Sequence, residues 1–509
     1  MGHNPASPMM RFAPPLLRST VVALSFASAL VQPVLAATGP VLGYDDARHL
    51  LARTGFGPTD AEVRVYAALT RDAAVAKLLL DTSTVAFTKP PASATDADSL
   101  PPPRGENATE AERKAFVQQQ IREGLELRAW WVEEMVTTKS PLTERMTLFW
   151  HNHFVSGQPK VRLSRLMYQQ NATLRAHALG NFGMLLHAVA KDPAMLVYLD
   201  GVRNRKGAPN ENFAREVMEL FTLGEGNYTE KDIKEAARAF TGWSVDRATG
   251  QYLFRPALHD YGVKTVLGKS GRFDGDDVLD LLLARPETAQ YVTSKLWREF
   301  VSPDVDPMEV RRIAARFRDS SYDIRVVLCE ILTSKAFYAS ENRGTLVKSP
   351  VELIVGTVRV FDLRPDRTLP FAYAAAGMGQ NLLAPPNVKG WPGGETWINT
   401  TTLLSRKQFV DRLTRADDTP APTASAMADG NADAVRRQRF IRQMDRGLSG
   451  VHFDSDPWMT RFPGETPVER ARWAQRLLLP VEPQQATDLS ADSLAVVRGL
   501  VLDAAYQLK

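Results

Sequence analysis

The chain has 509 residues, of which 44% are hydrophobic and 24% charged, and a formal net charge of +4. This composition is ordinary for a globular protein with a hydrophobic core and excludes a disordered chain. The near-neutral charge, without a basic stripe or tail, argues against a nucleic-acid partner. The single cysteine, Cys329, cannot form an internal disulfide, and its apolar neighbours predict a buried small side chain rather than a catalytic thiol.

The N-terminal segment has the features of a secretory signal peptide. Arg11 and Arg18 precede an uncharged stretch at residues 19–37, where Pro33 stands before a run of small residues. The apolar part is too short and too rich in Ala and Ser to cross a bilayer comfortably. We expect cleavage near Ala36, which leaves a soluble periplasmic or secreted protein of net charge +2 without a stable membrane anchor. An uncleaved anchor is the alternative.

Two stretches of biased composition divide the mature chain. Residues 89–110 are rich in proline and predict an exposed insertion, and residues 416–433 predict a linker. The boundaries are therefore a signal peptide at 1–36, a main helical domain at 38–415 and a C-terminal helical tail at 434–509. This length is sufficient for two lobes.

Helical periodicity dominates the main domain, and strand signals are sparse. Ser140 and Pro141 predict the start of a helix that runs towards residues 151–154. We predict a mainly α, multi-helical fold with few or no strands. The further predicted helices span residues 111–138, 161–191, 210–223, 229–241, 275–283, 286–300, 307–318, 323–337 and 349–361.

Several ordered motifs occur between residues 45 and 410. They are HLLARTGFGP at 49–58, LFWHNHF at 148–154, KDPAMLVYLD at 191–200, NENFAREVMELFTLG at 210–224, YTE at 228–230, ARAFTGW at 237–243, His259-Asp260 with Lys264 and LG at 267–268, and PPNVKGWP at 385–392. Together they resemble the bacterial domain of unknown function 1800 family. The resemblance implies an exported protein of uncharacterised function. It also implies a candidate partner, because members are commonly encoded beside a second exported family with an alkaline-phosphatase-like fold.

His151 and His153 form a His-x-His pair, a spacing common among metal ligands. In an extended segment both imidazoles point to one face, whereas in a helix the rings lie about 200° apart and cannot share an ion. A divalent metal at this pair is one hypothesis. Capping and packing beside the neighbouring aromatic residues is the other.

The predicted helix at 210–223 places two carboxylates, Glu216 and Glu219, on one stripe with Asn212. Close acids can divide into a proton donor and an ionised base, as hydrolysis of a glycosidic or ester bond requires. We therefore consider Glu216 and Glu219 as candidate catalytic residues, with Asn212 and Arg215 as substrate ligands. The alternative is structural, because Arg215 can pair with acids one turn away.

His259, Asp260 and Lys264 lie in a segment without helical periodicity. His259 is a candidate general base oriented by Asp260, and Lys264 is a candidate substrate ligand. The alternative is a polar loop whose side chains bond to nearby backbone groups. Trp243 and Trp391, both near glycines, are candidate stacking surfaces for sugar rings or can fill the core.

The sequence lacks a nucleophile elbow, a phosphate loop and a dinucleotide fingerprint. Two hypotheses remain. The chain is either a hydrolase acting on an envelope or extracellular polymer such as polysaccharide, or a non-catalytic binding or scaffold protein that works with the neighbouring exported family. The cofactor is unknown.

Overall fold

The computed structural model describes residues 39–95, 109–246, 248–414, 448 and 451–509. The predicted signal peptide and the predicted linker at 416–433 lie outside the described residues, as do parts of the proline-rich insertion and of the C-terminal tail. Residues Gly39–Lys509 form one unit by their internal contacts.

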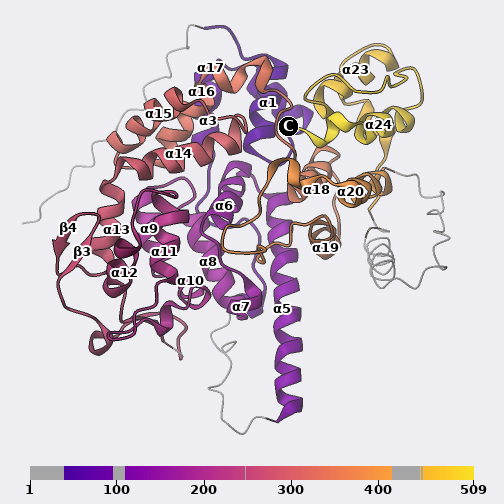
Figure 1. The fold of residues 1–509 in the computed structure, drawn as a ribbon. Helices are drawn as coiled ribbons and strands as arrows, with labels where there is room; N and C mark the ends of the chain where they lie inside the picture. Colours follow the sequence, from indigo (N-terminus) through magenta and orange to yellow (C-terminus); the bar gives the residue numbers. More distant parts are fainter. Residues whose placement is uncertain (1–38, 96–108, 247, 415–447, 449–450) are drawn as a thin grey trace, which may run out of the picture. The chain divides into compact units, whose positions relative to one another are not determined.

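The fold is mainly α, as predicted (Figure 1). The first half contains α1 (Tyr44–Thr54), α2 (Asp60–Ala67), α3 (Arg71–Leu80), α4 (Ala92–Thr95), α5 (Glu110–Thr137), α6 (Pro141–His153), α7 (Gln158–Val161), α8 (Ser164–Ala176), α9 (Phe182–Ala190), α10 (Pro193–Tyr198), α11 (Asn212–Glu216) and α12 (Glu230–Ala239). The second half contains α13 (Gly275–Ala284), α14 (Pro286–Phe300), α15 (Pro307–Asp319), α16 (Ile324–Thr333), α17 (Lys335–Tyr338), α18 (Pro350–Val360), α19 (Leu369–Gly377), α20 (Thr400–Leu413), α22 (Ser455–Met459), α23 (Pro467–Leu478) and α24 (Ser493–Leu502).

Short elements complete the described part of the chain. Strands β1 (Trp243–Val245) and β2 (Tyr252–Phe254) form one antiparallel pair, and β3 (Lys264–Val266) and β4 (Lys269–Gly271) form another. Between α11 and α12 lies a π-helical segment, η3 (Val217–Thr222). The remaining helical turns are η2 (Gly201–Arg203), η4 (Pro256–Leu258), η5 (Ser340–Asn342), η6 (Gly394–Trp397) and η7 (Ala504–Gln507).

Local sequence explains where many helices begin. Capping boxes, in which a side chain and a backbone N–H bond reciprocally, start α2, α5, α12, α13, α18, α20 and α23. Proline occupies the first turn of α6 and α14, where its missing N–H costs nothing.

The predicted helix at 161–191 is divided in the structure. The side chain of Asn181 accepts a hydrogen bond from the N–H of Met184 and caps α9. On either side of Asn181, the backbone bonds to the segment before α16, through Phe182 N to Tyr322 O and Ile324 N to Gly180 O. These contacts, distant in sequence, outweigh the helical periodicity.

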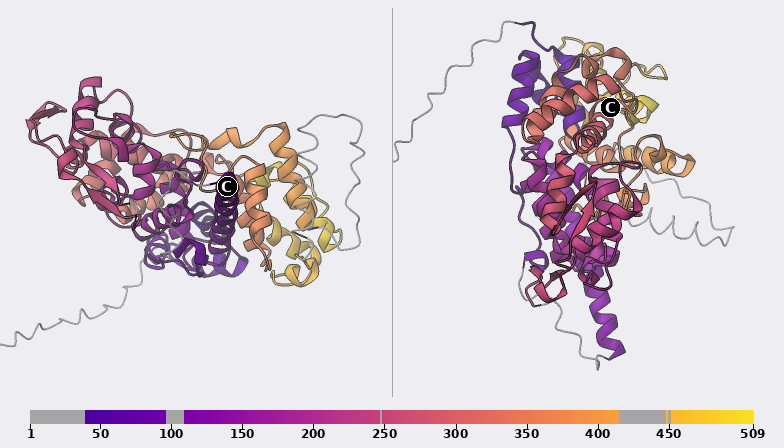
Figure 2. Two further views of the ribbon diagram at one scale, coloured as in Figure 1. Left: turned by 90° about the horizontal axis from the view of Figure 1, so that it is seen from below. Right: turned by 60° about the vertical axis from the view of Figure 1, so that its left-hand side comes forward.

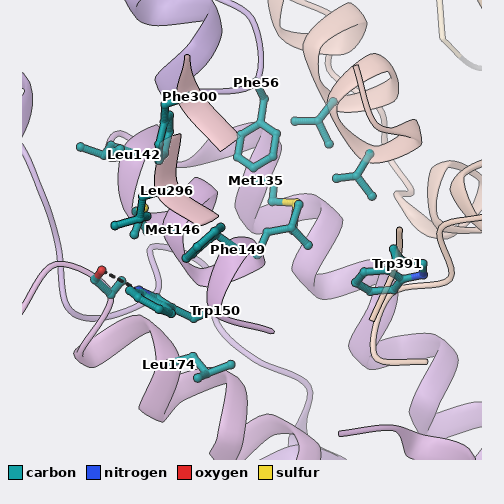
Figure 3. Packing of buried hydrophobic residues seen from close by; sticks show 14 of the residues in the cluster. Phe56, Met135, Leu142, Met146, Phe149, Trp150, Leu174, Leu296, Phe300 and Trp391 are labelled. Carbon is teal, nitrogen blue, oxygen red and sulfur yellow. Dashed lines mark hydrogen bonds between the residues drawn. The ribbon is translucent and has the colours of Figure 1, made fainter. Parts of the chain in front are cut away.

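Helix α6 lies in the core and is buried along almost its whole length. Figure 3 shows Met146 and Phe149 of this helix beside Leu296 and Phe300 of α14. Trp150 is fully buried, and its indole N–H donates to the carbonyl of Ala178 at 2.9 Å. Burying a large apolar side chain contributes roughly 1.5–3 kcal/mol, so α6 is well fixed in place.

Cys329 is exposed, and the prediction of a buried side chain is wrong. The buried face of α16 consists of Ile324, Val327, Leu328, Ile331 and Leu332. Cys329 lies off this stripe, because a helix turns by about 100° per residue. The run of apolar residues around Cys329 therefore did not show which face of α16 is buried.

The C-terminal helices pack on the same hydrophobic core as the main body. They lie beside α20 (yellow and orange in Figures 1 and 2), and α24 contacts α20. Trp458 donates its indole N–H to the carbonyl of Val360, and Lys348 N–H donates to the carbonyl of Gln507. No helix in the described ranges is both long enough and apolar enough to span a bilayer.

Candidate functional site

The end of α6 holds the loop that follows residue 384. Asn152 accepts a hydrogen bond from Trp391 N–H at 2.7 Å and donates its amide to the Trp391 carbonyl at 3.2 Å. Gly390 has φ +81°, and a Cβ there would lie 2.3 Å from the Asn152 side-chain oxygen. Asn152 and Gly390 therefore fit each other closely, and they join the LFWHNHF and PPNVKGWP motifs.

His151 and His153 do not meet, because α6 remains helical through residue 153. The His151 ring lies between Trp131 and Trp391, with centroids at 5.5 and 5.7 Å. The His153 ring contacts other aromatic rings, including Phe154 at 4.5 Å, and its Nε2 donates to the carbonyl of Phe221. This is the helical case, in which the two imidazoles cannot share an ion.

Burial governs the charge of both imidazoles. It lowers the pKa of His151 to about 4 and that of His153 well below its ordinary value, the latter with help from nearby Lys295. Both rings are therefore neutral near pH 7. Among the described residues, no group of three His, Cys, Asp or Glu side chains is arranged to hold a metal ion.

The motif at 210–224 changes from α to π geometry after Glu216. Thr222 donates its hydroxyl to the carbonyl of Val217, and the Phe221 carbonyl receives the bond from His153. π-Helical turns are rare and recur at functional sites. The π segment links the end of α6 to the acidic residues of this motif.

Glu219 is close enough to Glu216 for its charge to act on the Glu216 carboxyl. Burial, and then the Glu219 carboxylate, raises the pKa of Glu216 above its ordinary value. Glu219 accepts a hydrogen bond from the Tyr228 hydroxyl at 2.5 Å. A carboxyl whose pKa is raised therefore lies near a second acid that is held by a tyrosine hydroxyl.

The two residues predicted as substrate ligands on this motif have other roles in the structure. Arg215 pairs with Glu230 of α12 at 2.8 Å and with Glu211, one turn away, at 3.4 Å. Only the pair with Glu211 corresponds to the structural alternative considered for it. Asn212 is exposed at the first position of α11, where its N–H donates to the side chain of Asn210.

A cavity of about 400 Å³ lies where α6, α14 and the loop at 389–397 meet. Its lining combines aromatic rings, polar groups and charges from sequence-distant segments. Those residues include Phe149, Asn152 and His153 of α6, Lys295, Arg298 and Glu299 of α14, and Lys389, Trp391 and Trp397 of the loop.

The back wall of this cavity is a buried ion network centred on Glu352. Arg145 pairs with Glu352 at 2.7 Å and also with Glu299, and Lys509 pairs with Glu352. Burial alone would raise the pKa of Glu352, but Arg145 and Lys509 hold it below its ordinary value. The charges of this wall are largely compensated.

In the described ranges, the other cationic side chains of the lining, Lys389, Lys295 and Arg298, are not all paired with acids. Lys389 pairs with Glu225 at 3.3 Å on the surface. In the part of the chain that the structure describes, Lys295 and Arg298 have no carboxylate partner. Burial, and then the charge of Arg298, lowers the pKa of Lys295 to about 8. Two cations therefore line the cavity without an acidic partner among the described residues.

The predicted site at His259, Asp260 and Lys264 is not part of this cavity. His259 is buried and donates from Nδ1 to the Thr241 carbonyl at 2.8 Å. Asp260 pairs with Arg238 at 2.8 Å, and the Lys264 ammonium donates to three backbone carbonyls, of which that of Phe273 lies at 2.8 Å. The polar groups are used inside the loop, as in the structural alternative.

The two tryptophans predicted as stacking surfaces, Trp243 and Trp391, lie in different parts of the structure. Trp243 is a core residue of β1, packed against Phe240 at 5.1 Å, and lies outside the cavity. Trp391 is largely buried but lines the cavity. In the structure His153 and Trp391 line one cavity with Lys389, whose charge acts on Glu216 of α11, whereas His259 and Trp243 lie elsewhere.

Sequence reasoning missed Asn152, Lys295 and Arg298. Asn152 lies between His151 and His153, and the spacing of these histidines predicted a metal site rather than a role for the asparagine. In a predicted helix, Lys295 lies four residues after Tyr291, and Arg298 lies three residues after Lys295. This spacing places the three side chains on one stripe. That stripe was visible in the sequence, but what it faces was not.

Comparison with known proteins adds one relationship. No curated protein and no solved structure matches the chain. A family model matches residues 49–484, which include every motif named above. The chain belongs to the family described as "Protein of unknown function (DUF1800)".

Proposed function

We propose that the protein is exported and binds an envelope or extracellular polymer, with polysaccharide the leading candidate, in the cavity between α6, α14 and the loop at 389–397. The observation that carries this proposal is the lining, in which Phe149, Trp391 and Trp397 share one cavity with cationic and amide side chains. Aromatic faces beside a few polar groups are typical of small-ligand and sugar sites. The volume lies within the usual range of about 300–1,000 Å³.

Export is part of the same proposal and rests on the N-terminal sequence. Arginines followed by a short apolar run and a small-residue site favour cleavage near Ala36 and a periplasmic or secreted product. N-terminal sequencing of the protein recovered outside the cytoplasm checks this: a first residue near position 37 supports it, and an intact N-terminus contradicts it.

Binding is tested with the loop-holding residue. Asn152→Ala removes both hydrogen bonds that fix Trp391, so we expect oligosaccharide affinity, measured by calorimetry, to fall by about ten-fold or more. Asn342→Ala is the matched control, because it removes a 2.8 Å side-chain bond to the Ala336 carbonyl away from the cavity. Equal effects of the two variants would count against the site.

A second candidate function, hydrolysis of the polymer, is favoured by the Glu216–Glu219 pair. Lys389 lines the cavity and its charge acts on Glu216, which relates this pair of acids to the cavity. We expect Glu216→Gln and Glu219→Gln each to reduce release of reducing ends by about 10²-fold or more. Glu211→Gln, which removes only the weak pair with Arg215, should leave release unchanged. Undiminished release from both variants would exclude these acids as catalysts.

The partner is also a proposal. An exported protein with an alkaline-phosphatase-like fold is the candidate, and the exposed apolar side chains around β2 and the following loop offer a contact surface. They are Leu253, Phe254, Leu258, Tyr261 and Val263. Loss of co-purification on replacing Phe254 and Tyr261 by serine is the expected result.

A further inference from the structure

One face of α14 carries an aromatic ring followed by two cations. The Lys295 ammonium lies 5.4 Å from the centre of the Tyr291 ring, and Arg298 follows one turn later. Lys295 and Arg298 both line the cavity, and the charge of Arg298 acts on Lys295. Positions 291, 295 and 298 recur at helical spacing, so the three side chains form one stripe.

The other cations of the cavity already have acidic partners. Arg145 and Lys509 pair with Glu352, and Lys389 pairs with Glu225. Within the described residues, Lys295 and Arg298 have none. Five cationic and two carboxylate side chains line the cavity, so the excess positive charge is concentrated on the α14 side.

Holding two unpaired cations together in a recess is unfavourable without an anion. The lowered pKa of Lys295 reflects this cost, since burial and Arg298 both oppose its charge. An oxyanion placed between an ammonium and a guanidinium would accept charge-assisted hydrogen bonds from both. Phe149, Trp391 and Trp397 line the same cavity and suit the less polar face of a sugar ring.

We infer that the ligand of this cavity is an acidic polysaccharide segment, whose carboxylate or sulfate group binds between Lys295 and Arg298 while its ring lies against the aromatic wall. This inference rests on the proposed function and specifies its substrate class. Acidic and neutral polymers differ in the group that Lys295 and Arg298 recognise, so selectivity for charge belongs to α14.

The experiment compares three oligosaccharides of matched length with the purified full chain: a galacturonate oligomer, a sulfated galactan oligomer and a neutral galactan oligomer. Affinities are measured by calorimetry at low and at physiological salt. We expect the two acidic oligomers to bind at least about ten-fold more tightly than the neutral one, and this advantage to shrink as salt screens the charges.

Variants locate the effect. Lys295→Met keeps the apolar stem and removes the charge, and Arg298→Gln changes an exposed side chain that makes no ion pair among the described residues. Each should weaken binding of the acidic oligomers by at least about ten-fold and leave neutral binding unchanged. Arg311→Gln, an exposed cation on α15 outside the cavity, should change neither. If Lys295→Met fails to fold, Arg298→Gln alone decides.

Each other outcome is informative. Equal affinity for acidic and neutral oligomers, or unchanged acidic binding in the folded variants, overturns the inference but leaves polymer binding standing. Absence of binding to all three oligomers overturns the proposed function as well. Inorganic polyphosphate bound as tightly as the acidic oligomers would mean recognition of charge without a sugar, and would overturn the inference too.

Discussion

The pKa of Asp192 is determined mainly by burial of its carboxyl group. The carboxyl is almost completely buried, caps α10 by accepting a hydrogen bond from Met195 N–H, and accepts another from the Gln170 amide. These bonds favour the carboxylate, but burial is the larger effect and raises the pKa of Asp192 to about 7. The residue belongs to the KDPAMLVYLD motif, so this part of the family pattern includes a buried capping carboxyl.

The raised pKa predicts a pH-dependent stability. The native state favours the neutral carboxyl, so the stabilisation from this group is present below pH 3.8 and is lost as the pH rises to about 7. Asp192→Asn cannot ionise. We expect its free energy of unfolding, relative to the parent chain, to increase by about 2–3 kcal/mol between pH 5 and pH 8.

Urea unfolding at the two pH values measures this difference. Asp306→Asn is the control, because Asp306 caps α15 in the same manner but is exposed. Its effect should be the same at pH 5 and pH 8. A pH-independent effect of Asp192→Asn would show that the native carboxyl is already ionised at pH 5.

The sequence showed which types of residue occur at each position, but not which polar side chains already have hydrogen-bond partners. Candidate site residues could be chosen from the sequence by their type, as Glu216 and Trp391 were. Whether a polar side chain is already bonded could not be predicted in this way, and the Lys264 ammonium illustrates this by donating to three carbonyls of its own neighbourhood. Partners of that kind depend on loop geometry, which has no sequence period.

Among the elements, the loop at 385–397 depends most on its contact with α6. The Gly390 backbone approaches Asn152 so closely that a Cβ would lie 2.3 Å from the side-chain oxygen and 2.7 Å from the backbone oxygen. Gly394 in the same loop also has a positive φ, +57°, but a Cβ there would meet nothing within 4 Å. The two glycines thus separate backbone strain from steric conflict.

Replacing these glycines by alanine therefore has unequal effects. Gly394→Ala should cost about 1 kcal/mol for the left-handed backbone. Gly390→Ala should cost at least about 2 kcal/mol more, because the loop must move away from α6. The thermal unfolding midpoint measures both. In an Asn152→Ala background the cost of Gly390→Ala should shrink, and an unchanged cost would show that Asn152 does not fix the loop.

The sequence predicted the presence of helices better than their ends and their irregular turns. The fold class and most helices followed from periodicity and caps, because both are local properties of the sequence. The π turn at 217–222 and the break at Asn181 depend on bonds to His153 and to the segment before α16. Contacts of this kind are distant in sequence, so no local pattern predicts them.

At the scale of the whole molecule, buried charge ties the C-terminal segment to the body. Lys509 and Arg145 both pair with Glu352 of α18, and the Lys348 ammonium donates to the Tyr506 carbonyl at 2.7 Å. Burial lowers the pKa of Lys348 to about 7. Composition biased towards Thr, Pro, Ala, Gly and Asn predicted a linker before this segment, but the sequence did not reveal where the segment packs.

Glu352→Gln therefore affects the whole chain. It leaves Arg145 and Lys509 buried without their shared carboxylate, and breaking a buried pair in this way costs about 3–5 kcal/mol. Arg476→Gln is the control. It removes the exposed pair between α23 and Asp45 of α1, which also joins the C-terminal segment to the body, and should cost less than about 1 kcal/mol.

Urea unfolding, followed by tryptophan fluorescence, distinguishes the two contributions. Because the C-terminal helices share the hydrophobic core, the described part of the parent chain should unfold in one transition. We expect Glu352→Gln to lower the midpoint of that single transition strongly. A separate early transition in this variant would instead mean that the C-terminal segment detaches on its own, and a loss no larger than that of Arg476→Gln would show that Glu352 contributes little beyond a surface ion pair.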